Sequence, residues 1–208
     1  MIDDGLFNQF SIDEVYAFHN MPGMSLGSFA TRPGTITASE SIFKIELWGQ
    51  GGHSALPHMG VDTITVGTQI ITSLQSIVSR KLNPAMNGVV SVTDFKSNGN
   101  ENVLPGYSVI TGDTRALSPD ANKIIESSMN DIVKGIAAAH GIKVEFSYKT
   151  RTNMTINSRE QTLAAAKVAS SMVGSQNVDS NCEPKLFSED FSQMLMVKPG
   201  CFILIGNG

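Results

Sequence analysis

The sequence predicts an α/β (α+β) fold in which a regular central unit is inserted between two flanking pieces. Strand-type and helix-type hydrophobic patterns alternate regularly from about residue 39 to residue 148. The regularity ends after Arg151. Each flank is too short to bury a core of its own, so the two flanks are expected to fold together. The expected division is therefore 1–35, 36–149 and 150–208.

The central unit reads as β-α-β-β-α-β. Phe43, Ile45 and Leu47 alternate with polar or amphipathic residues, which is the period of a strand with one buried face. Two crossovers and a central hairpin fold most simply into a four-stranded sheet with both helices on one face, a ferredoxin-like arrangement. The expected elements are strands at 43–47, 89–95, 107–115 and 144–148, and helices that begin at Asp62 and Ser118.

The flanks predict fewer elements. A short apolar strand, 15–18, precedes a loop that runs from 19 to 34. Ser158 and Gln161 have the spacing of a capping box and predict a helix that ends at Gly174. A short helix at 189–196 and an apolar strand at 201–205 complete the chain.

Composition excludes several classes of protein. The 208 residues carry 15 Lys and Arg against 19 Asp and Glu, so no basic excess is available to bind nucleic acid. No apolar run approaches the ~18 residues of a membrane span. Two cysteines are too few for a disulfide scaffold. No export signal is visible, which makes the cytoplasm the default location.

His19 is the first candidate for chemistry, because it directly follows a buried strand and precedes a turn. Ligands of α/β proteins collect at the carboxyl ends of strands, and a neutral imidazole there can bind a metal. The alternative is a hydrogen-bonded turn residue.

His53 lies in a glycine-rich loop, GQGGHSALPH. Glycines let the backbone approach a ligand closely, and an imidazole presented there can donate to an oxyanion. The alternative is a tight turn. His58 is more simply an exposed or capping residue, and His140 a packed or capping residue at a helix end.

Three further polar residues are candidates for binding. The guanidinium fork of Arg115 suits a carboxylate, and the amide of Asn102 can add a hydrogen bond. Their alternatives are a surface ion pair and a turn residue. Glu189 is either a helix N-terminal carboxylate or a partner of a metal or ligand. Serine hydrolase, P-loop and dinucleotide-binding motifs do not occur in the sequence.

An ordered series of motifs resembles one family over essentially the whole chain. The series is MIDDGLF, AFHNMPG, GGHSALPHMGVD, NVLPG, GDTRALSP, FSEDF and PGCFILIGNG. It is similar to the amidohydrolase branch of the di-metal aminoacylase and carboxypeptidase superfamily, which includes hippurate hydrolase and auxin-conjugate hydrolases. The resemblance implies a metal-bearing α/β catalytic domain interrupted by a ferredoxin-like satellite domain that commonly forms homodimers.

The same resemblance implies roles for the candidates. His19 matches a metal ligand, and His53 matches a satellite-domain histidine that stabilises the tetrahedral intermediate, often in the neighbouring subunit. Asn102 and Arg115 match positions that hold the substrate carboxylate. Glu189 matches the acidic residue of the family's G-S-E-D-F segment, although Phe187 stands where glycine is usual.

Two family motifs are missing from the sequence. Neither the Cys-Gly-His-Asp-x-His metal motif nor the Glu-Glu pair that supplies the general base occurs here. The resemblance therefore implies an internal fragment of an enzyme that uses Zn, Mn, Co or Ni to hydrolyse N-acyl amino acids. We expect the fragment to be inactive and to bind no metal stably. The alternatives are a non-catalytic dimerisation or binding module, and a relative acting on succinylated or acetylated diamino acids.

Overall fold

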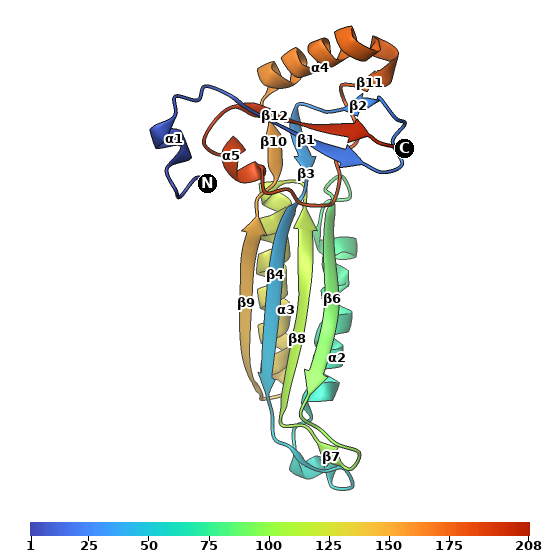
Figure 1. Cartoon of the computed structure of the whole chain (residues 1–208). Coiled ribbons are helices and arrows are strands. Elements are labelled where there is room, and N and C mark those ends of the chain that lie inside the picture. Colours follow the sequence, from blue (N-terminus) through green and yellow to red (C-terminus); the bar gives the residue numbers. More distant parts are fainter. The chain divides into compact units, whose positions relative to one another are not determined.

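A computed structural model describes all residues, 1–208, and shows a mixed α/β fold. The chain divides into two compact units (Figure 1). Unit 1 consists of residues 1–39 and 152–208, and unit 2 consists of residues 40–151. Each unit has its own cluster of buried apolar side chains.

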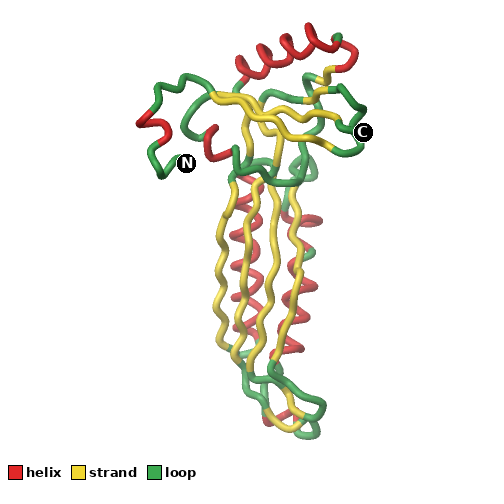
Figure 2. Tube along the Cα trace, in the orientation of Figure 1, coloured by secondary structure: helices red, strands yellow, loops and turns green.

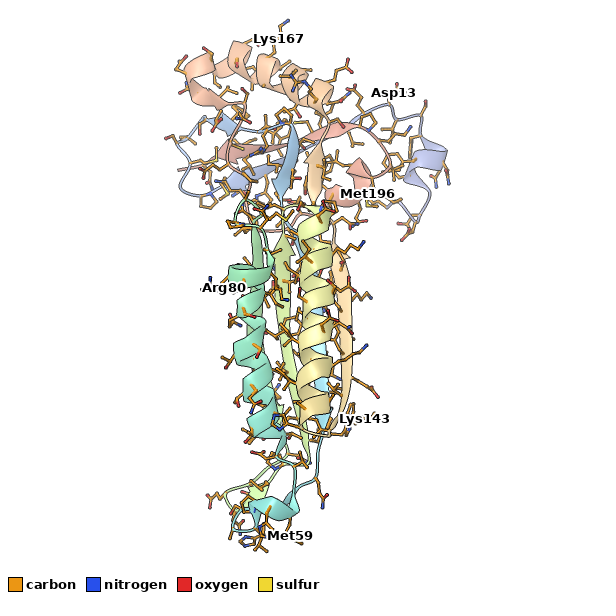
Figure 3. All side chains as sticks on the ribbon, turned by 180° about the vertical axis from the view of Figure 1, so that it is seen from behind. Asp13, Met59, Arg80, Lys143, Lys167 and Met196 are labelled. Carbon is orange, nitrogen blue, oxygen red and sulfur yellow. The ribbon has the colours of Figure 1, made fainter.

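Unit 2 is built on a four-stranded sheet with the strand order β6-β8-β4-β9. If the four strands of unit 2 are numbered along the chain, their spatial order is 2-3-1-4. This is the ferredoxin-like arrangement predicted from the pattern. Two helices cover one face of this sheet (Figures 2 and 3). The elements are β4 (Ser39–Trp48), α2 (Thr63–Leu74), β6 (Gly88–Ser97), β8 (Tyr107–Ala116), α3 (Pro119–Ala139) and β9 (Lys143–Thr152).

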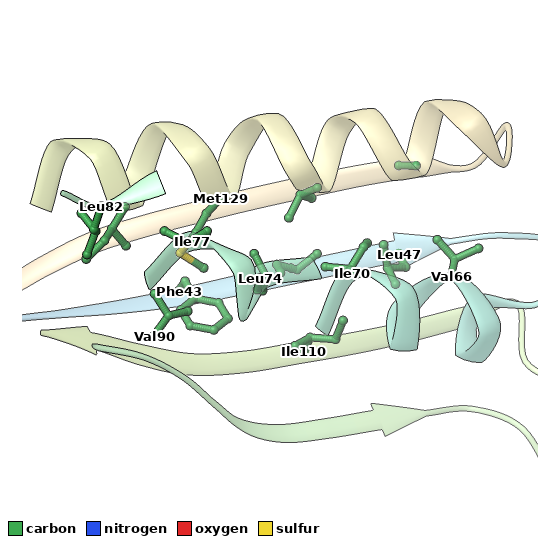
Figure 4. Packing of buried hydrophobic residues seen from close by; sticks show 14 of the residues in the cluster. Phe43, Leu47, Val66, Ile70, Leu74, Ile77, Leu82, Val90, Ile110 and Met129 are labelled. Carbon is green, nitrogen blue, oxygen red and sulfur yellow. The ribbon is translucent and has the colours of Figure 1, made fainter. Parts of the chain in front are cut away.

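The core of unit 2 lies between the sheet and the two helices (Figure 4). Alternate residues of β4, including Phe43, Ile45 and Leu47, are buried as the alternation predicts. Ile70 of α2 and Met129 of α3 are fully buried against the same face. Burial of these side chains is the main driving force for this unit, at about 1.5–3 kcal/mol for each large apolar side chain.

Both predicted helix starts in unit 2 are confirmed. Asp62 caps α2 by accepting hydrogen bonds from the amides of Ile64 and Thr65. Ser118 caps α3 by accepting from the amide of Ala121, with proline at the first helical position. A π-helical turn, Ile77–Lys81, extends the first helix beyond Leu74.

One end of unit 2 carries two small loops. The strands β5 (Gly52–His53) and β7 (Val103–Leu104) pair antiparallel. A 3₁₀ turn, Pro57–Met59, lies in the same region, where Figure 3 labels Met59.

Unit 1 contains a second four-stranded sheet, in the order β1-β12-β2-β11. The strand β1 is parallel to β12 and lies at the edge of the sheet. Two short strands, β3 and β10, form a separate pair. The elements are α1 (Leu6–Gln9), β1 (Val15–Met21), β2 (Phe29–Ala30), β3 (Gly34–Thr37), β10 (Thr155–Asn157), α4 (Arg159–Val173), β11 (Val178–Asp179), α5 (Ser192–Leu195) and β12 (Gly200–Gly206).

Three details of unit 1 differ from the prediction. The first strand continues through His19 to Met21, and the last predicted helix shrinks to the four residues of α5. The capping box is wrong. The hydroxyl of Ser158 accepts a hydrogen bond from the backbone amide of Gly200. The side-chain amide of Gln161 donates to the carboxylate of Glu14 at 2.7 Å. Both side chains therefore form long-range contacts instead of closing the first turn of α4.

A buried amide connects the strands of unit 1. The Nδ2 of Asn157 lies within 3.2 Å of the Thr31 hydroxyl, the Arg32 carbonyl and the Phe202 carbonyl. Its Oδ1 accepts from the amide of Phe202 at 2.7 Å. Asn157 thus fixes β12, the strand that pairs with β1.

None of the helices combines the length and apolar character needed to cross a membrane.

Candidate functional site

A hollow of about 600 Å³ opens in unit 1 beside the carboxyl half of β1. His19 of β1 and the adjacent acids Glu189 and Asp190 contribute to its lining. Aromatic and aliphatic side chains form the rest of the wall, including Phe191 and Phe202. With Asp3, the hollow therefore places an imidazole and three carboxyl groups in one partly apolar recess.

The hydrogen bond made by His19 determines which of its ring nitrogens is available. Nδ1 lies 2.7 Å from the carbonyl oxygen of Asn20. Because a carbonyl can only accept, Nδ1 carries the proton and the neutral ring leaves a lone pair on Nε2. Histidines that bind metals are typically oriented by this kind of bond to a backbone carbonyl. The His19 ring also lies 6.2 Å from that of Phe187 and 6.4 Å from that of Phe202.

Glu189 has an environment that favours its neutral form. Burial raises the pKa of Glu189, and the neighbouring Asp190 raises it further, whereas the attraction of His19 acts in the opposite direction. The amide of Phe191 lies 3.4 Å from Oε1 of Glu189. Glu189 is therefore held at the wall of the hollow by its own chain segment.

His19 fits a metal as a single ligand. No group of three or more His, Cys, Asp or Glu side chains within the 208 residues is placed to hold a metal ion. Cys182 and Cys201 are buried in unit 1, and burial raises the pKa of both thiols, which disfavours the thiolate that binds metals. Further ligands would have to come from outside this chain to complete a coordination sphere.

His53 and Asn102 lie together at one end of unit 2. His53 pairs with Val103 in the β5–β7 ladder, and the amide of Ser54 donates to the Asn102 carbonyl at 3.0 Å. The Nδ1 of His53 accepts from the amide of Ala55 at 3.1 Å. Nδ1 is therefore the unprotonated nitrogen, and the remaining nitrogen of the exposed ring can donate to a ligand.

Arg115 lies at the opposite end of β8. Tyr107, the first residue of β8, marks the end of the strand nearest in sequence to Asn102. Arg115 lies eight residues further along the strand, a distance of about 26 Å. Its Nε lies 2.7 Å from Oδ2 of Asp113, and its Nη2 lies 3.1 Å from Oε1 of Glu40. Within one copy of the chain, Arg115 and Asn102 therefore do not face the same binding position.

Several residues of these sites were not predicted from the sequence. Asp3 and Asp190 line the hollow of His19, and Glu40 reaches Arg115 from β4. Two had a local signal: Asp190 is the neighbour of Glu189, and Asp113 is two residues from Arg115 in one strand, where such residues share a face. The other contacts depend on tertiary folding.

Sequence comparison identifies a hydrolase family for this chain, and solved structures of similar proteins share its fold. The chain belongs to peptidase family M20/M25/M40, whose sequence model matches residues 1–208. This confirms the resemblance seen in the ordered motifs.

Curated relatives give the same result. The chain is 34% identical over 207 residues to hippurate hydrolase of Campylobacter jejuni, and the match covers 100% of this chain and 54% of that protein. It is 32% identical over 206 residues to N-acetyldiaminopimelate deacetylase of Exiguobacterium sibiricum, with coverage of 99% and 55%. The chain thus spans about half the length of the curated relatives it matches.

Solved structures confirm the fold. A crystal structure from methicillin-resistant Staphylococcus aureus superposes with a TM-score of 0.88 at 32% identity, covering 99% of this chain and 52% of that one. The Bacillus subtilis YXEP protein, described as a dinuclear metal-binding peptidase of the M20 family, gives a TM-score of 0.78 at 26% identity. The match covers 99% of this chain and 50% of the YXEP chain.

Proposed function

We propose that these residues form part of a metal-dependent amidohydrolase that cleaves the amide bond of N-acyl amino acids. The observation that carries the proposal is the orientation of His19. Its protonated Nδ1 faces a backbone carbonyl, and its ring lines a hollow with three carboxyl groups. Membership of the M20 family and the similarity to hippurate hydrolase support the substrate class.

His19 would hold one divalent cation (Zn, Mn, Co or Ni) together with ligands from outside this chain. When bound, such a cation supplies polarisation of the scissile carbonyl. Glu189 is a supporting residue beside the ligand. Its raised pKa suits a carboxyl group that forms a hydrogen bond within the recess.

His53 and Asn102 act on the substrate from the end of unit 2. The imidazole of His53 donates to the oxygen that gains negative charge as the amide is attacked. The Asn102 side chain adds a hydrogen bond to the substrate. Because unit 2 is proposed to be a satellite domain that forms homodimers, these two residues can serve the catalytic domain of the neighbouring subunit.

Arg115 would bind the carboxylate of the N-acyl amino acid. Its guanidinium already contacts Asp113 and Glu40, so the local group carries a formal charge of −1. The two carboxylates fix the orientation of the fork, and the guanidinium has five N–H donors. An anionic substrate must therefore share this guanidinium with the two acids or displace one of them.

The isolated chain is proposed to be inactive. The family's Glu-Glu pair does not occur in the sequence, and the hollow offers no group of three metal-binding side chains. The same observation favours the second candidate, a non-catalytic dimerisation or binding module. Both candidates predict a folded protein without a stable metal complex, and they differ in whether His19 binds metal weakly and in preference to the other histidines.

Two experiments test the proposal. Release of glycine from benzoyl-glycine is measured for the 208-residue chain with Mn²⁺, Zn²⁺ or Co²⁺, and the expected result is no turnover above that of the metal alone. Robust metal-dependent turnover would contradict the inactive state. Metal titration of the wild type and His19→Ala then separates the candidates. Loss of a binding event in His19→Ala supports the hydrolase, and identical isotherms support the module.

The coding region on both sides of these residues provides an independent test. The hydrolase predicts that it encodes the Cys-Gly-His-Asp-x-His motif and the Glu-Glu pair in the same reading frame. Stop codons on both sides of the segment would support the module.

A further inference from the structure

The hydrogen bond made by His19 does not fix the orientation of its imidazole ring by itself. The χ2 torsion of a histidine is broad and roughly two-fold, so a ring turned by about 180° is a competing state. The bond from Nδ1 to the Asn20 carbonyl lies at an exposed position, where water competes for both groups. A single orientation of the ring therefore requires packing in addition to this bond.

Phe202 supplies part of this packing from the neighbouring strand. Ala17 is paired with Phe202 across β1 and β12, which are parallel and lie side by side in Figure 1. His19 follows Ala17 by two residues, so its side chain lies on the same face of the sheet as that of Phe202. The centroids of the His19 and Phe202 rings are 6.4 Å apart, and Phe202 is buried. The core therefore holds one of the two rings that neighbour the imidazole.

Phe187 brings the second ring to His19 from a different segment of unit 1. The two ring centroids are 6.2 Å apart, with 37° between the ring planes. This separation and the one to Phe202 fall within the range of about 4.5–7 Å that is typical of stabilising aromatic pairs. The Phe187 side chain is partly buried against the same apolar cluster as Phe202. Its carbonyl shares the amide hydrogen of Ala38 with the carbonyl of Lys185, each at 3.0 Å. The backbone of Phe187 is thus attached to the chain directly after β3, independently of β1.

Phe187 does not line the hollow, although His19 and Phe202 both do. It therefore packs against the imidazole without occupying the space in which a ligand would lie. A ring at this position is a feature of this chain, since glycine is usual there in the family. We propose that Phe187 is a positioning residue, which holds the His19 ring in the orientation that leaves Nε2 available to a metal ion. The inference rests on the proposed function for the metal and adds a residue that acts through His19.

The test compares variants of the whole chain without metal, at an alkaline pH where the imidazole is neutral. Phe187→Ala removes the ring, and Phe187→Tyr keeps it. Phe187→Leu removes the ring but keeps most of the apolar volume, so it replaces Phe187→Ala if that variant does not fold. Phe7→Ala is the matched control, because Phe7 is partly buried against the same apolar cluster and has no ring contact with His19. Circular dichroism checks that each variant is folded.

The measurement is the position of the proton on the His19 ring, which long-range ¹⁵N–¹H correlations report. Phe187→Ala and Phe187→Leu are expected to convert the Nδ1-protonated ring into a mixture of the two tautomers. Phe187→Tyr and Phe7→Ala are expected to keep the proton on Nδ1. If Phe187 only filled space in the core, both alanine variants would lose stability and neither would move the proton. An unchanged tautomer without the Phe187 ring, or the same change in Phe7→Ala, overturns the proposal.

Zinc titration of the same variants connects the ring orientation to metal binding. The Kd read from the Nε2 resonance of His19 is expected to rise about two- to tenfold in Phe187→Ala and to return to the wild-type value in Phe187→Tyr. An equal Kd in the wild type and Phe187→Ala overturns the positioning role. Failure of wild-type His19 to respond to zinc contradicts the proposed function instead, and the metal-free comparison still decides whether Phe187 orients the ring.

Discussion

Asn157 is the polar residue whose loss should most weaken unit 1. Its side chain is 3% exposed and contacts the Thr31 hydroxyl, the Arg32 carbonyl, and both the carbonyl and the amide of Phe202. The primary amide has two N–H donors, so the three acceptors near Nδ2 share two hydrogen bonds. With the bond accepted by Oδ1, three hydrogen bonds are at stake.

The expected cost of Asn157→Ala follows from these bonds. Each lost bond contributes about 0.5–1.5 kcal/mol net, and a buried group left without a partner costs about 1–3 kcal/mol. The Phe202 carbonyl keeps the Thr31 hydroxyl at 2.9 Å. The Phe202 amide loses its partner. We therefore expect the free energy of unfolding to fall by about 3 kcal/mol, a large part of the ~5–15 kcal/mol typical of a folded protein.

Urea denaturation followed by far-ultraviolet circular dichroism measures this loss. Asn153→Ala is the matched control, because the Asn153 amide contacts only the weakly accepting sulfur of Met196. The control is expected to change stability by about 0.5 kcal/mol or less. Trp48, the single tryptophan, belongs to unit 2, so its fluorescence reports whether the loss is confined to unit 1. A loss below about 1 kcal/mol in Asn157→Ala would refute the role assigned to this amide.

Three further predictions concern a helix cap, acid stability and the cysteines. Asp62→Ala is expected to lower stability by about 1 kcal/mol in urea denaturation, because two amides lose their cap. A hydrogen bond from Tyr107 lowers the pKa of the Glu46 carboxyl group, and a hydrogen bond from Lys44 lowers it further. This stabilisation is therefore present above the unfolded-state pKa and is lost as pH falls through the folded-state pKa, so acidification should weaken the wild type more than Glu46→Gln. Cys182 and Cys201 are buried, so a thiol reagent should react slowly with native protein and quickly in denaturant.

Controls and contrary outcomes separate these predictions from general effects. Asp131→Ala, an exposed change within α3, should cost less than Asp62→Ala, and equal losses would contradict the cap. Parallel acid profiles for the wild type and Glu46→Gln would contradict the sign of the pKa shift. Rapid native labelling of two thiols would contradict their burial.

Local patterns in the sequence were sufficient to predict most of unit 2. The alternation around Phe43 and Ile45, and the caps at Asp62 and Ser118, are determined by residues within a few positions of one another. Burial of an alternating face and capping of a first turn are short-range physics. These elements therefore appeared where the patterns placed them.

Contacts between distant residues could not be predicted in this way. Ser158 and Gln161 have capping-box spacing, yet they bind Gly200 and Glu14, which lie 42 and 147 positions away. Glu40 contacts Arg115 from 75 positions away. Once the chain folds, a distant partner can satisfy a side chain better than its own helix end does, and a single sequence carries no local signal for such a choice.

The candidate site could be predicted only in part from the sequence, for the same reason. The sequence pattern indicated His19 by placing it directly after a strand, although β1 in fact continues to Met21, and its orientation by the Asn20 carbonyl is a neighbour contact. The approach of Asp3 and Asp190 to the same hollow depends on how unit 1 closes. The ion pairs that hold Arg115 likewise required the strand order of unit 2.

The nitrogen NMR spectrum of the four histidines tests the role of His19 most directly. Long-range ¹⁵N–¹H correlations distinguish the two ring nitrogens, and His19→Gln assigns the signals. The account predicts that neutral His19 carries its proton on Nδ1 and that added Zn²⁺ shifts its Nε2 resonance before that of any other histidine. A proton on Nε2, or a zinc response confined to the other three rings, would contradict it.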